Sequence, residues 1–372
     1  MKVTILDRAR QIAERADKGG VIWAPLRVFL VICSWKYGAV VRTRRFLYTH
    51  IPGLQRRVTA HVVSVGNITV GGSGKTPLVE MYAKRWLEQG KRVAIVSRGY
   101  GRSRTCAQDA SLPPALRPPR GVRVVSDGSG SIYLTAEESG DEPYLLAGKL
   151  PAAAVLVSRD RYGASRFAIE HLGAEVIVLD DAFQHLLLHR DEDIVAVDAI
   201  NPFGNGHLLP RGTLRELPTS LRRATRVLVT KVLPGNAGSA VERALAHIRA
   251  VAPQVPVSLT RYVPTHLAAH SSGERMPLDY LKGKKVLAFC GIADPIFFEQ
   301  TVEYLGARIV RARRFPDHYR YTLADLASIN KDAVQHGDDV IVTTEKDMVR
   351  LPGGFSTERP ICAVAVEIGI DD

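Results

Sequence analysis

Two kinds of hydrophobic pattern alternate along most of the chain. Short continuous apolar runs are typical of buried parallel strands, and apolar residues three or four positions apart are typical of the helices that cover them. The strands predicted in this way are 61–65, 92–97, 176–180, 285–290, 307–310 and 339–344, and helices are predicted at 296–305 and 323–336. The alternation predicts an α/β protein with a mainly parallel sheet covered on both faces.

The length of 372 residues favours two domains. We expect residues 1–57 to be a basic N-terminal segment that belongs to the first domain, and residues 58–258 to form the main part of that domain. Residues 265–352 should form a smaller α/β domain, and residues 353–372 a C-terminal strand or tail that returns to the first domain. The proline-rich stretch 112–121 has the composition of an exposed insertion.

The formal net charge of +12 is concentrated near the N-terminus. Residues 1–60 contain twelve Lys and Arg residues and three acidic residues, whereas the rest of the chain is close to balanced. Because the excess is local, we do not interpret the net charge as a nucleic-acid signal, and we predict no nucleic-acid partner.

The basic region is interleaved with an apolar and aromatic segment, residues 21–37. Its longest uncharged run, Val28–Trp35, is much shorter than the roughly 20 residues that cross a bilayer, and no signal-peptide cleavage pattern follows it. We predict an interfacial helix with aromatic side chains at headgroup depth and basic side chains near anionic lipid. The aromatic set is Trp23, Phe29, Trp35 and Tyr37, and the basic set is Arg27, Lys36, Arg42, Arg44 and Arg45. The alternative is an amphipathic helix packed on the protein's own core.

The cysteines give no sign of a disulfide framework or a zinc site. Cys33, Cys106, Cys290 and Cys362 lie far apart in sequence, without C-x-x-C spacing. We therefore expect a protein of the reducing cytoplasm.

A glycine-rich stretch follows the first predicted strand. Residues 71–76 read Gly-Gly-Ser-Gly-Lys-Thr, in which small residues let backbone N–H groups converge on phosphate oxygens, the lysine reaches the outer phosphates and the hydroxyl binds Mg²⁺. The general pattern has glycine where this chain has Thr69, and the alternative is a turn that only caps a helix. Pro77, near the expected helix start, places the loop at the positive end of a helix dipole and favours nucleotide binding.

A second candidate site lies at the end of the strand 176–180. Asp180 and Asp181 stand at its carboxyl end, where open α/β sheets bind ligands. In phosphate-loop enzymes a carboxylate in this place holds Mg²⁺, directly or through water. The alternative is a pair of strand-end caps, but the phosphate loop in the same chain favours a metal site.

Phosphoryl transfer to a hydroxyl also needs a proton acceptor and positive charge. Asp141 and His318 both follow turn signals and are candidates for the acid–base role, and the loop with Arg98 and Arg102 could face phosphate. For each of them the alternative is a solvated loop residue.

Taken together, seven motifs resemble those of the tetraacyldisaccharide 4′-kinase family. They are Ser-Val-Gly-Asn-Ile-Thr-Val-Gly-Gly-Ser-Gly-Lys-Thr-Pro (64–77), Ser-Arg-Gly-Tyr-Gly-Arg (97–102), Gly-Asp-Glu-Pro (140–143), Asp-Asp-Ala-Phe-Gln-His (180–185), Gly-Ile-Ala-Asp-Pro (291–295), Phe-Pro-Asp-His-Tyr (315–319) and Thr-Glu-Lys-Asp (344–347). The motifs occur in order across nearly the whole chain, and Thr69 matches the family's form of the loop. Two departures are Ala182, where the family usually has glycine, and the long insertion at 112–121.

The resemblance implies an ATP- and Mg²⁺-dependent kinase that phosphorylates the 4′-hydroxyl of a tetraacylated glucosamine disaccharide 1-phosphate in lipid A biosynthesis. It implies that Asp141 is the base, that His318 supports it, and that Lys75 binds the β- and γ-phosphates. The implied ATP-binding residues are Thr69, Val70, Gly71, Gly72, Ser73, Gly74, Lys75, Thr76, Arg98 and Arg161, and the implied metal-binding residues are Thr76, Asp180, Asp181 and Glu216.

The fold that goes with this function is a P-loop kinase with two α/β/α sandwich-like domains and an N-terminal amphipathic helix. We expect a monomer bound peripherally to the cytoplasmic face of the bacterial inner membrane, with the acylated disaccharide 1-phosphate and anionic lipid as partners. Asp141 falls in the larger predicted domain and His318 in the smaller, so the pair would form by closure across a cleft. The alternatives from other classes are a membrane-surface P-loop NTPase without a lipid acceptor and a nucleotide sensor without turnover.

Overall fold

The computed structural model describes residues 23–103, 112–232, 238–270 and 272–371. The chain forms two compact units. Unit 1 comprises the residues up to Val96, Asp160–Arg261 and the chain end from Ile370, and unit 2 comprises Ser97–Arg159 and Tyr262–Gly369.

This grouping differs from the predicted division, which placed all of 58–258 in one domain. Residues 97–159 belong with the C-terminal part of the chain, because their helix α5 (Asp141–Lys149) is bound by ion pairs to helix α10 (Glu345–Met348) and the residues just after it. Hydrophobic periodicity predicts the elements, but it does not say which distant elements touch.

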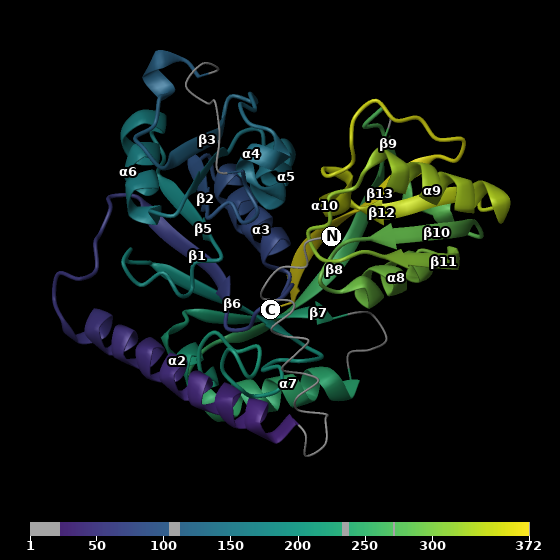
Figure 1. Ribbon diagram of the computed structural model, residues 1–372. Helices are drawn as coiled ribbons and strands as arrows, with labels where there is room; N and C mark the ends of the chain where they lie inside the picture. Colours follow the sequence, from purple (N-terminus) through teal and green to yellow (C-terminus); the bar gives the residue numbers. More distant parts are fainter. Residues whose placement is uncertain (1–22, 104–111, 233–237, 271, 372) are drawn as a thin grey trace. The chain divides into compact units, whose positions relative to one another are not determined.

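Unit 1 is built on parallel strands in the order β8–β7–β6–β1–β5–β2 (Figure 1). The strands are β1 (His61–Asn67), β2 (Val93–Ser97), β5 (Val176–Asp180), β6 (Glu192–Asp198), β7 (Arg226–Val232) and the first part of β8 (Val257–Ala269). The helices are α2 (Ala24–His50), α3 (Lys75–Glu88), α6 (Arg161–Leu172), α7 (Gly238–Val251) and the 3₁₀ helix η4 (Pro218–Arg223). Every residue of β2 and β5 is buried, as expected of strands covered on both faces.

The pairing of β1 with β5 fixes the edge at which a ligand can bind. The two strands run parallel, with Val65 opposite Asp180. The loops that follow them therefore leave the sheet at the same edge, next to each other.

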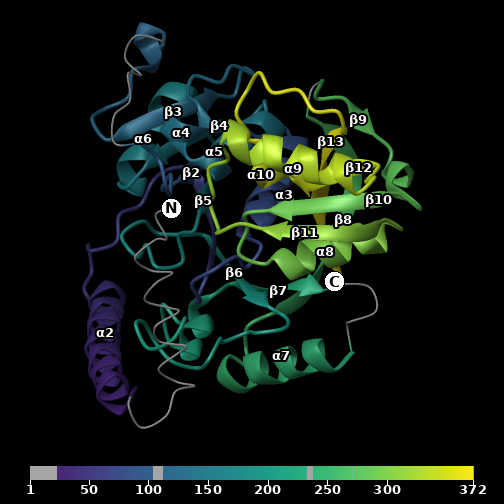
Figure 2. The same ribbon diagram turned by 45° about the vertical axis from the view of Figure 1, so that its right-hand side comes forward.

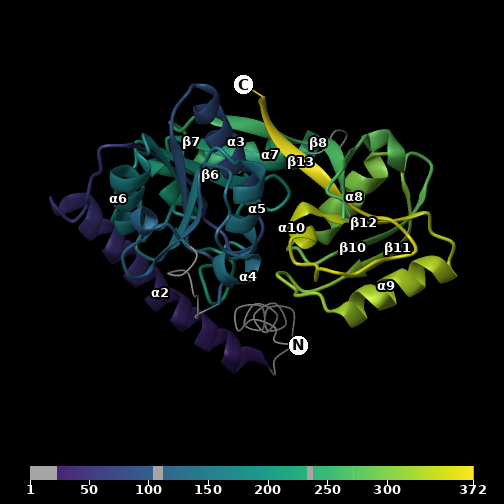
Figure 3. The same cartoon turned by 90° about the horizontal axis from the view of Figure 1, so that it is seen from above.

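Unit 2 contains parallel strands in the order β11–β10–β12–β13, with helices on both faces (Figures 2 and 3). Along β10 (Lys285–Cys290), Val286 and Ala288 pack in the cluster that includes helix α8, whereas Leu287 and Phe289 pack in the cluster that includes helix α9. This alternation is the period of two of a strand.

The remaining elements of unit 2 complete these two faces and include an antiparallel pair of strands, β3 and β4. They are β11 (Arg308–Arg314), β12 (Val340–Thr344), β13 (Ile361–Asp371), β9 (Arg275–Met276), α8 (Pro295–Tyr304), α9 (Leu323–Gln335), η5 (Leu278–Leu281), the antiparallel strands β3 (Val122–Asp127) and β4 (Ala154–Ser158), α4 (Ala136–Ser139) and η3 (Pro114–Leu116). The α/β class and all of the predicted strands and helices are confirmed, with ends shifted by a few residues at most. The C-terminal strand pairs with β12 inside unit 2, and only the chain end from Ile370 is grouped with unit 1.

Helix α2 has one packed face and one exposed apolar face. On the packed face, the Ser34 hydroxyl donates to the Leu208 carbonyl (2.8 Å) and the Tyr37 hydroxyl donates to the Arg215 carbonyl (3.0 Å). Tyr37 is therefore directed toward the protein, contrary to the prediction that it lies at headgroup depth. The opposite face exposes Val28, Phe29, Ile32, Trp35, Val40, Phe46 and Leu47. At about 3.6 residues per turn these positions fall on one side of the helix and form one stripe.

The length of α2 also changes the membrane prediction. The helix has 27 residues, and only 11% of an apolar stretch of 18 residues within it is buried. By length and composition the helix could cross a membrane, which the short run Val28–Trp35 did not indicate.

Two smaller predictions concern the insertion and the cysteines. Most described side chains of 112–121 are exposed or half-buried, as predicted, but Leu112 is buried. Cys33, Cys290 and Cys362 have free thiols, and Cys106 lies outside the described residues.

Substitution of Gly66 in β1 tests how tightly the protein packs beneath the ligand-binding edge of the sheet. A Cβ added to Gly66 would lie 2.6 Å from the Cβ and the backbone nitrogen of Phe183, which is fully buried. We expect Gly66→Ala to lower the free energy of unfolding by about 1–3 kcal/mol, measured by urea denaturation. The control is Gly148→Ala in α5, where the added Cβ meets nothing within 4 Å and should leave stability unchanged or raise it by up to about 1 kcal/mol. Unchanged stability of Gly66→Ala would contradict the packing described.

Candidate active site

The glycine-rich loop connects β1 to α3. Helix α3 begins at Lys75, and Gly74 just before it has a φ of 74°, a left-handed conformation that glycine adopts without strain. At the base of the loop the buried Asn67 side chain donates from Nδ2 to the Ser73 hydroxyl (2.8 Å). The loop thus ends at a helix N-terminus, where unpaired backbone N–H groups and the helix dipole favour an anion.

The residues just before the glycines are held by a neighbouring strand-like segment. The Val70 N–H donates to the Thr213 carbonyl (2.8 Å), Thr69 forms a bridge with Leu214, and the Arg215 N–H donates to the Ile68 carbonyl (2.7 Å). These bonds fix the main chain of Arg215 beside the phosphate loop.

The Arg215 and Lys75 side chains both contact Asp181. The Arg215 Nη1 atom donates to the two carboxylate oxygens (2.7 and 2.9 Å), and the Lys75 Nζ atom lies 3.6 Å from Oδ1. Burial by itself would raise the pKa of Asp181, but the charges of Lys75 and Arg215 outweigh it and hold the pKa well below its usual range. Asp181 is therefore ionised at neutral pH. Its φ of 49° is unusual for a residue with a side chain and is typical of functional turns.

The donor atoms at this edge suit Mg²⁺. Asp180 ends β5 with its side chain 2% exposed, Asp181 follows it, and Thr76 follows Lys75 in α3. Hydroxyl and carboxylate oxygens are hard ligands, and Mg²⁺ in nucleotide sites keeps several waters and binds the phosphates themselves. Within the described ranges no three His, Cys, Asp or Glu side chains gather around a metal site. This arrangement fits an ion shared between one or two protein groups and a nucleotide.

Two other predicted ligands make contacts with the protein itself. Arg161 is 4% exposed and donates from Nη2 to the main-chain oxygen of Asp180 (2.9 Å). Glu216 is 3% exposed, and both of its carboxylate oxygens accept from Arg223 (2.8 Å each). Arg223 in turn covers the Phe183 ring and donates to the Phe183 carbonyl. These contacts support the segment 180–185, and direct binding of phosphate by Arg161 or metal by Glu216 stays a prediction.

The predicted acid–base pair is formed inside unit 2. Asp141 is the first residue of α5, and its Oδ2 atom lies 3.0 Å from the Nδ1 atom of His318. The same Oδ2 accepts from Nε of Arg350 (2.7 Å). Burial alone would raise the pKa of Asp141, but the hydrogen bond from His318 and the charge of Arg350 outweigh it, so the pKa is lowered. The prediction that the pair forms only when two domains close is wrong, because both residues belong to one unit and are already in contact.

A left-handed turn aims His318 at Asp141. His318 lies in the turn between β11 and α9 with a φ of 59°, a conformation in which histidine is enriched among non-glycine residues. Its N–H donates to the Gly291 carbonyl (3.1 Å), and the Tyr100 ring lies 5.3 Å from the imidazole. The left-handed turn therefore directs the imidazole toward Asp141, and the backbone hydrogen bond and the Tyr100 ring hold it there.

Sequence reasoning assigned no role to three charged residues of these sites: Arg215, Arg350, and Lys346 of the motif 344–347. Lys346 pairs with Glu142 (2.9 Å) beside Asp141. Arg215 stands next to Glu216, which was considered, but Arg350 is 209 positions from Asp141, and one sequence carries no signal that pairs them. Arg98, which was predicted to bind phosphate, is exposed, and that role stays a prediction.

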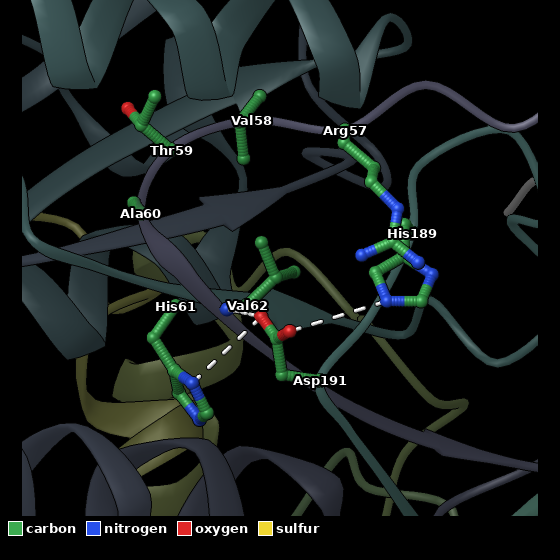
Figure 4. A pocket seen from close by; sticks show the side chains of 8 residues that line it. All are labelled: Arg57, Val58, Thr59, Ala60, His61, Val62, His189 and Asp191. Carbon is green, nitrogen blue, oxygen red and sulfur yellow. Dashed lines mark hydrogen bonds and ion pairs between the residues drawn. The ribbon is translucent and has the colours of Figure 1, made fainter.

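A separate pocket of about 240 Å³ lies at the other end of β1 (Figure 4). His61 and His189 both face Asp191 there, at 3.7 and 4.0 Å, and the Val62 N–H donates to the same carboxylate (2.7 Å). Because a strand rises about 3.3 Å per residue, this pocket lies roughly 20 Å from the phosphate loop along β1. We assign it no part in nucleotide binding.

Comparisons with known proteins give one consistent family. Residues 26–372 match the family model described as "LpxK: Tetraacyldisaccharide-1-P 4'-kinase". The chain is 43% identical over 339 residues to the tetraacyldisaccharide 4'-kinase of Anaeromyxobacter dehalogenans (strain 2CP-C), covering 90% of this chain and 84% of that protein. It is 37% identical to the tetraacyldisaccharide 4'-kinase of Syntrophus aciditrophicus (strain SB), covering 99% of this chain and 96% of that one.

A solved structure shows the same fold. The "apo" form of LpxK from Aquifex aeolicus in complex with ATP is similar to this chain with a TM-score of 0.69 and 31% sequence identity, over 93% of this chain and 95% of that one.

His185 lies in the segment after Asp181, and its burial should make the stability of the protein depend on pH. Burial and the charge of Arg161 lower its pKa from 6.5 to about 4. Between these values the unfolded chain binds a proton that the folded chain does not, so the free energy of unfolding falls as the pH is lowered from 6.5 to 4, by at most about 3 kcal/mol. His185→Gln should remove this part of the decrease, measured by urea denaturation at about pH 7 and about pH 4.5.

The control for this test is His171→Gln, at the exposed end of α6. This variant should change its free energy of unfolding between the two pH values by about as much as the wild type does. If the change for His185→Gln is as large as well, burial of His185 is not a source of acid sensitivity.

Proposed function

The chain belongs to the tetraacyldisaccharide 4′-kinase family and is an ATP-dependent kinase of lipid A biosynthesis, and we propose that the two groups of residues described above carry out the transfer. The phosphate loop of unit 1 binds ATP, and Asp141 of unit 2 activates the 4′-hydroxyl of a tetraacylated disaccharide 1-phosphate. The observation that carries the proposal is the 3.0 Å contact between Asp141 and His318, because an acceptor hydroxyl needs a proton acceptor and nucleotide binding alone does not.

On the nucleotide side, backbone N–H groups of the loop and the Lys75 ammonium bind the β- and γ-phosphates. Thr76 and the pair Asp180 and Asp181 are the residues that would hold Mg²⁺, and the ion would supply positive charge that offsets the charge of the phosphates. Arg215, anchored beside the loop, keeps the Asp181 carboxylate ionised and oriented. These residues neutralise charge and fix the γ-phosphoryl group for in-line attack.

On the acceptor side, the 4′-oxygen attacks the γ-phosphorus, the bond from that phosphorus to the bridging oxygen of ADP breaks, and Asp141 takes the hydroxyl proton. A carboxylate oxygen can only accept, so the His318 Nδ1 atom carries the hydrogen of the pair. Because His318 and Arg350 both bind Oδ2, the proton goes to Oδ1 of Asp141. No covalent enzyme intermediate is needed.

A P-loop NTPase without a lipid acceptor is the second candidate function. It would use Lys75 and Asp181 in the same way. It gives no role to the partly buried contacts that join Asp141 to His318 and Arg350, so the kinase accounts for more of the molecule.

The substrate class explains the two faces of α2. A lipid with four acyl chains stays in the bilayer, so its kinase has to work at the membrane surface. We propose that the exposed stripe of α2, which includes Phe29 and Trp35, enters the lipid on the cytoplasmic face of the inner membrane, with Arg42, Arg44 and Arg45 near anionic headgroups.

The proposed reaction does not require an oligomer. Both groups of proposed catalytic residues come from one chain, so a monomer is sufficient.

Transfer of the γ-phosphoryl group from Mg²⁺·ATP to tetraacyldisaccharide 1-phosphate in detergent micelles tests the reaction. We expect Asp141→Asn and His318→Gln to lower kcat on the order of 100-fold or more, with binding of ATP retained, because the base is lost but the phosphate loop is intact. Lys75→Met should weaken ATP binding as well, measured separately by calorimetry.

Three results would argue against this assignment. Hydrolysis of ATP that does not respond to the lipid would favour the NTPase. Full transfer by Asp141→Asn would remove the proposed base. ATP binding by Lys75→Met equal to that of the wild type would remove the proposed phosphate ligand.

Flotation of the full chain with vesicles of phosphatidylethanolamine and phosphatidylglycerol tests the membrane role of α2. The double variant Phe29→Gln/Trp35→Gln should reduce binding on the order of tenfold or more, because it removes two large apolar side chains from the stripe. The control is Tyr304→Gln in α8, where a tyrosine is 61% exposed in unit 2. Equal loss in both variants would argue against a role of the stripe, and wild-type binding that resists alkaline carbonate would indicate a spanning helix.

A further inference from the structure

Three ion pairs join the base-bearing helix α5 to the segment that starts with α10. Asp141 pairs with Arg350 (2.7 Å), Glu142 with Lys346 (2.9 Å) and Lys149 with Glu345 (2.9 Å). The first pair is the most buried on the basic side, since the Arg350 side chain is only 2% exposed. The motif 344–347 and Arg350 thus contact both ends of the helix, and Lys346 and Arg350 contact the N-terminal end that carries Asp141.

We propose that Arg350 is a positioning residue for phosphoryl transfer: it binds Oδ2, fixes the rotamer of the Asp141 carboxylate and leaves Oδ1 to take the proton of the acceptor hydroxyl. The inference rests on the proposed role of Asp141 as the base. Arg350 acts through Asp141 and His318 and need not touch the substrate itself.

Arg350 contacts Asp141 directly and is linked to His318 through the Gly291 carbonyl. Its Nε atom donates to Oδ2 of Asp141 (2.7 Å), and its Nη1 atom donates to the Gly291 carbonyl (2.8 Å). That same carbonyl accepts the N–H of His318 (3.1 Å). One guanidinium therefore ties the carboxylate to the turn that carries the imidazole.

The guanidinium is itself held rigidly from behind. Its Nη1 atom also donates to Oδ1 of Asp347 (3.1 Å), whose side chain is fully buried. Asp347 accepts further hydrogen bonds from the Gly291 N–H (2.9 Å) and the Tyr321 hydroxyl (2.9 Å). A planar donor fork fixed in this way orients a carboxylate better than a flexible ammonium would.

The charges around Asp141 agree with this role. The groups that face it are His318, Arg350 and Lys346, and Lys346 is balanced by Glu142 and by Asp317 (3.9 Å). Arg350 therefore supplies the fixed positive charge closest to the carboxylate. A phosphoryl group transferred through a loose transition state depends on the position of the attacking oxygen more than on a strong base, so an oriented, weakly basic carboxylate suffices.

The test measures transfer across pH for the wild type, Arg350→Met and Arg350→Lys. Arg350→Met should lower kcat on the order of 100-fold, as expected for a misplaced reacting group, with KM for ATP unchanged because the phosphate loop is untouched. The acidic limb of its kcat profile should move to higher pH, since Asp141 loses a positive neighbour. Arg350→Lys should have a kcat between those of Arg350→Met and the wild type, and its acidic limb should lie at an intermediate pH.

Lys149→Met is the matched control, because it breaks another ion pair between the same two segments without touching Asp141. It should lower Tm with no change in the pH profile. If Arg350→Met lowers Tm and activity but keeps the wild-type acidic limb, Arg350 is only structural and the inference is wrong.

An NMR titration of Asp141, which does not depend on phosphoryl transfer, distinguishes failure of this inference from failure of the proposed function. The carboxyl ¹³C signal of Asp141, assigned by its loss in Asp141→Asn, should titrate at higher pH in Arg350→Met than in the wild type. An unchanged titration would overturn the inference even if the wild type transfers phosphate. A shifted titration in a protein that transfers no phosphate to the lipid would instead refute the proposed function, and with it the role of Arg350 in catalysis.

Discussion

The parallel pairing of β1 with β5 determines where the nucleotide site can form. With Val65 opposite Asp180, the glycine-rich loop and the Asp180–Asp181 turn leave the sheet at one edge. Opposite charges then meet there: Lys75 and Arg215 hold Asp181 ionised, and the α3 dipole favours an anion in the same place. A change in the register of either strand would separate the loop from the carboxylates.

The Asp141–His318 pair in unit 2 is supported by charged side chains that are themselves buried. Arg350 and Asp347 are almost completely removed from water, and each would be strongly destabilising without partners. The hydrogen bonds from Gly291, Tyr321 and Arg350 offset that cost and leave a rigid support behind Asp141. The stability of unit 2 and the geometry of the Asp141 carboxylate therefore depend on the same contacts.

Helix α2 has two different faces, one packed on unit 1 and one exposed. Ser34 and Tyr37 hydrogen-bond to unit 1, while the stripe around Trp35 faces outward. An apolar surface of this kind on a folded protein is expected to contact a membrane or a partner. The Tyr37 bond ends on the carbonyl of Arg215, whose side chain holds Asp181, so the helix is in contact with the same segment that orders the nucleotide site.

The sequence by itself determined the elements and the chemistry of their ends. Continuous apolar runs and short-range turn signals depend on neighbouring residues, so β1, β5, β10 and the phosphate loop were predicted close to their observed positions. Ordered motifs also identified the family and named Asp141, His318 and Lys75. The tertiary structure alone decided which distant elements touch: that residues 97–159 belong with the C-terminal part, that Tyr37 faces inward, and that Arg215 and Arg350 hold the two key carboxylates. Such contacts join positions up to 209 residues apart and arise from packing and charge pairing in three dimensions, which local pattern does not encode.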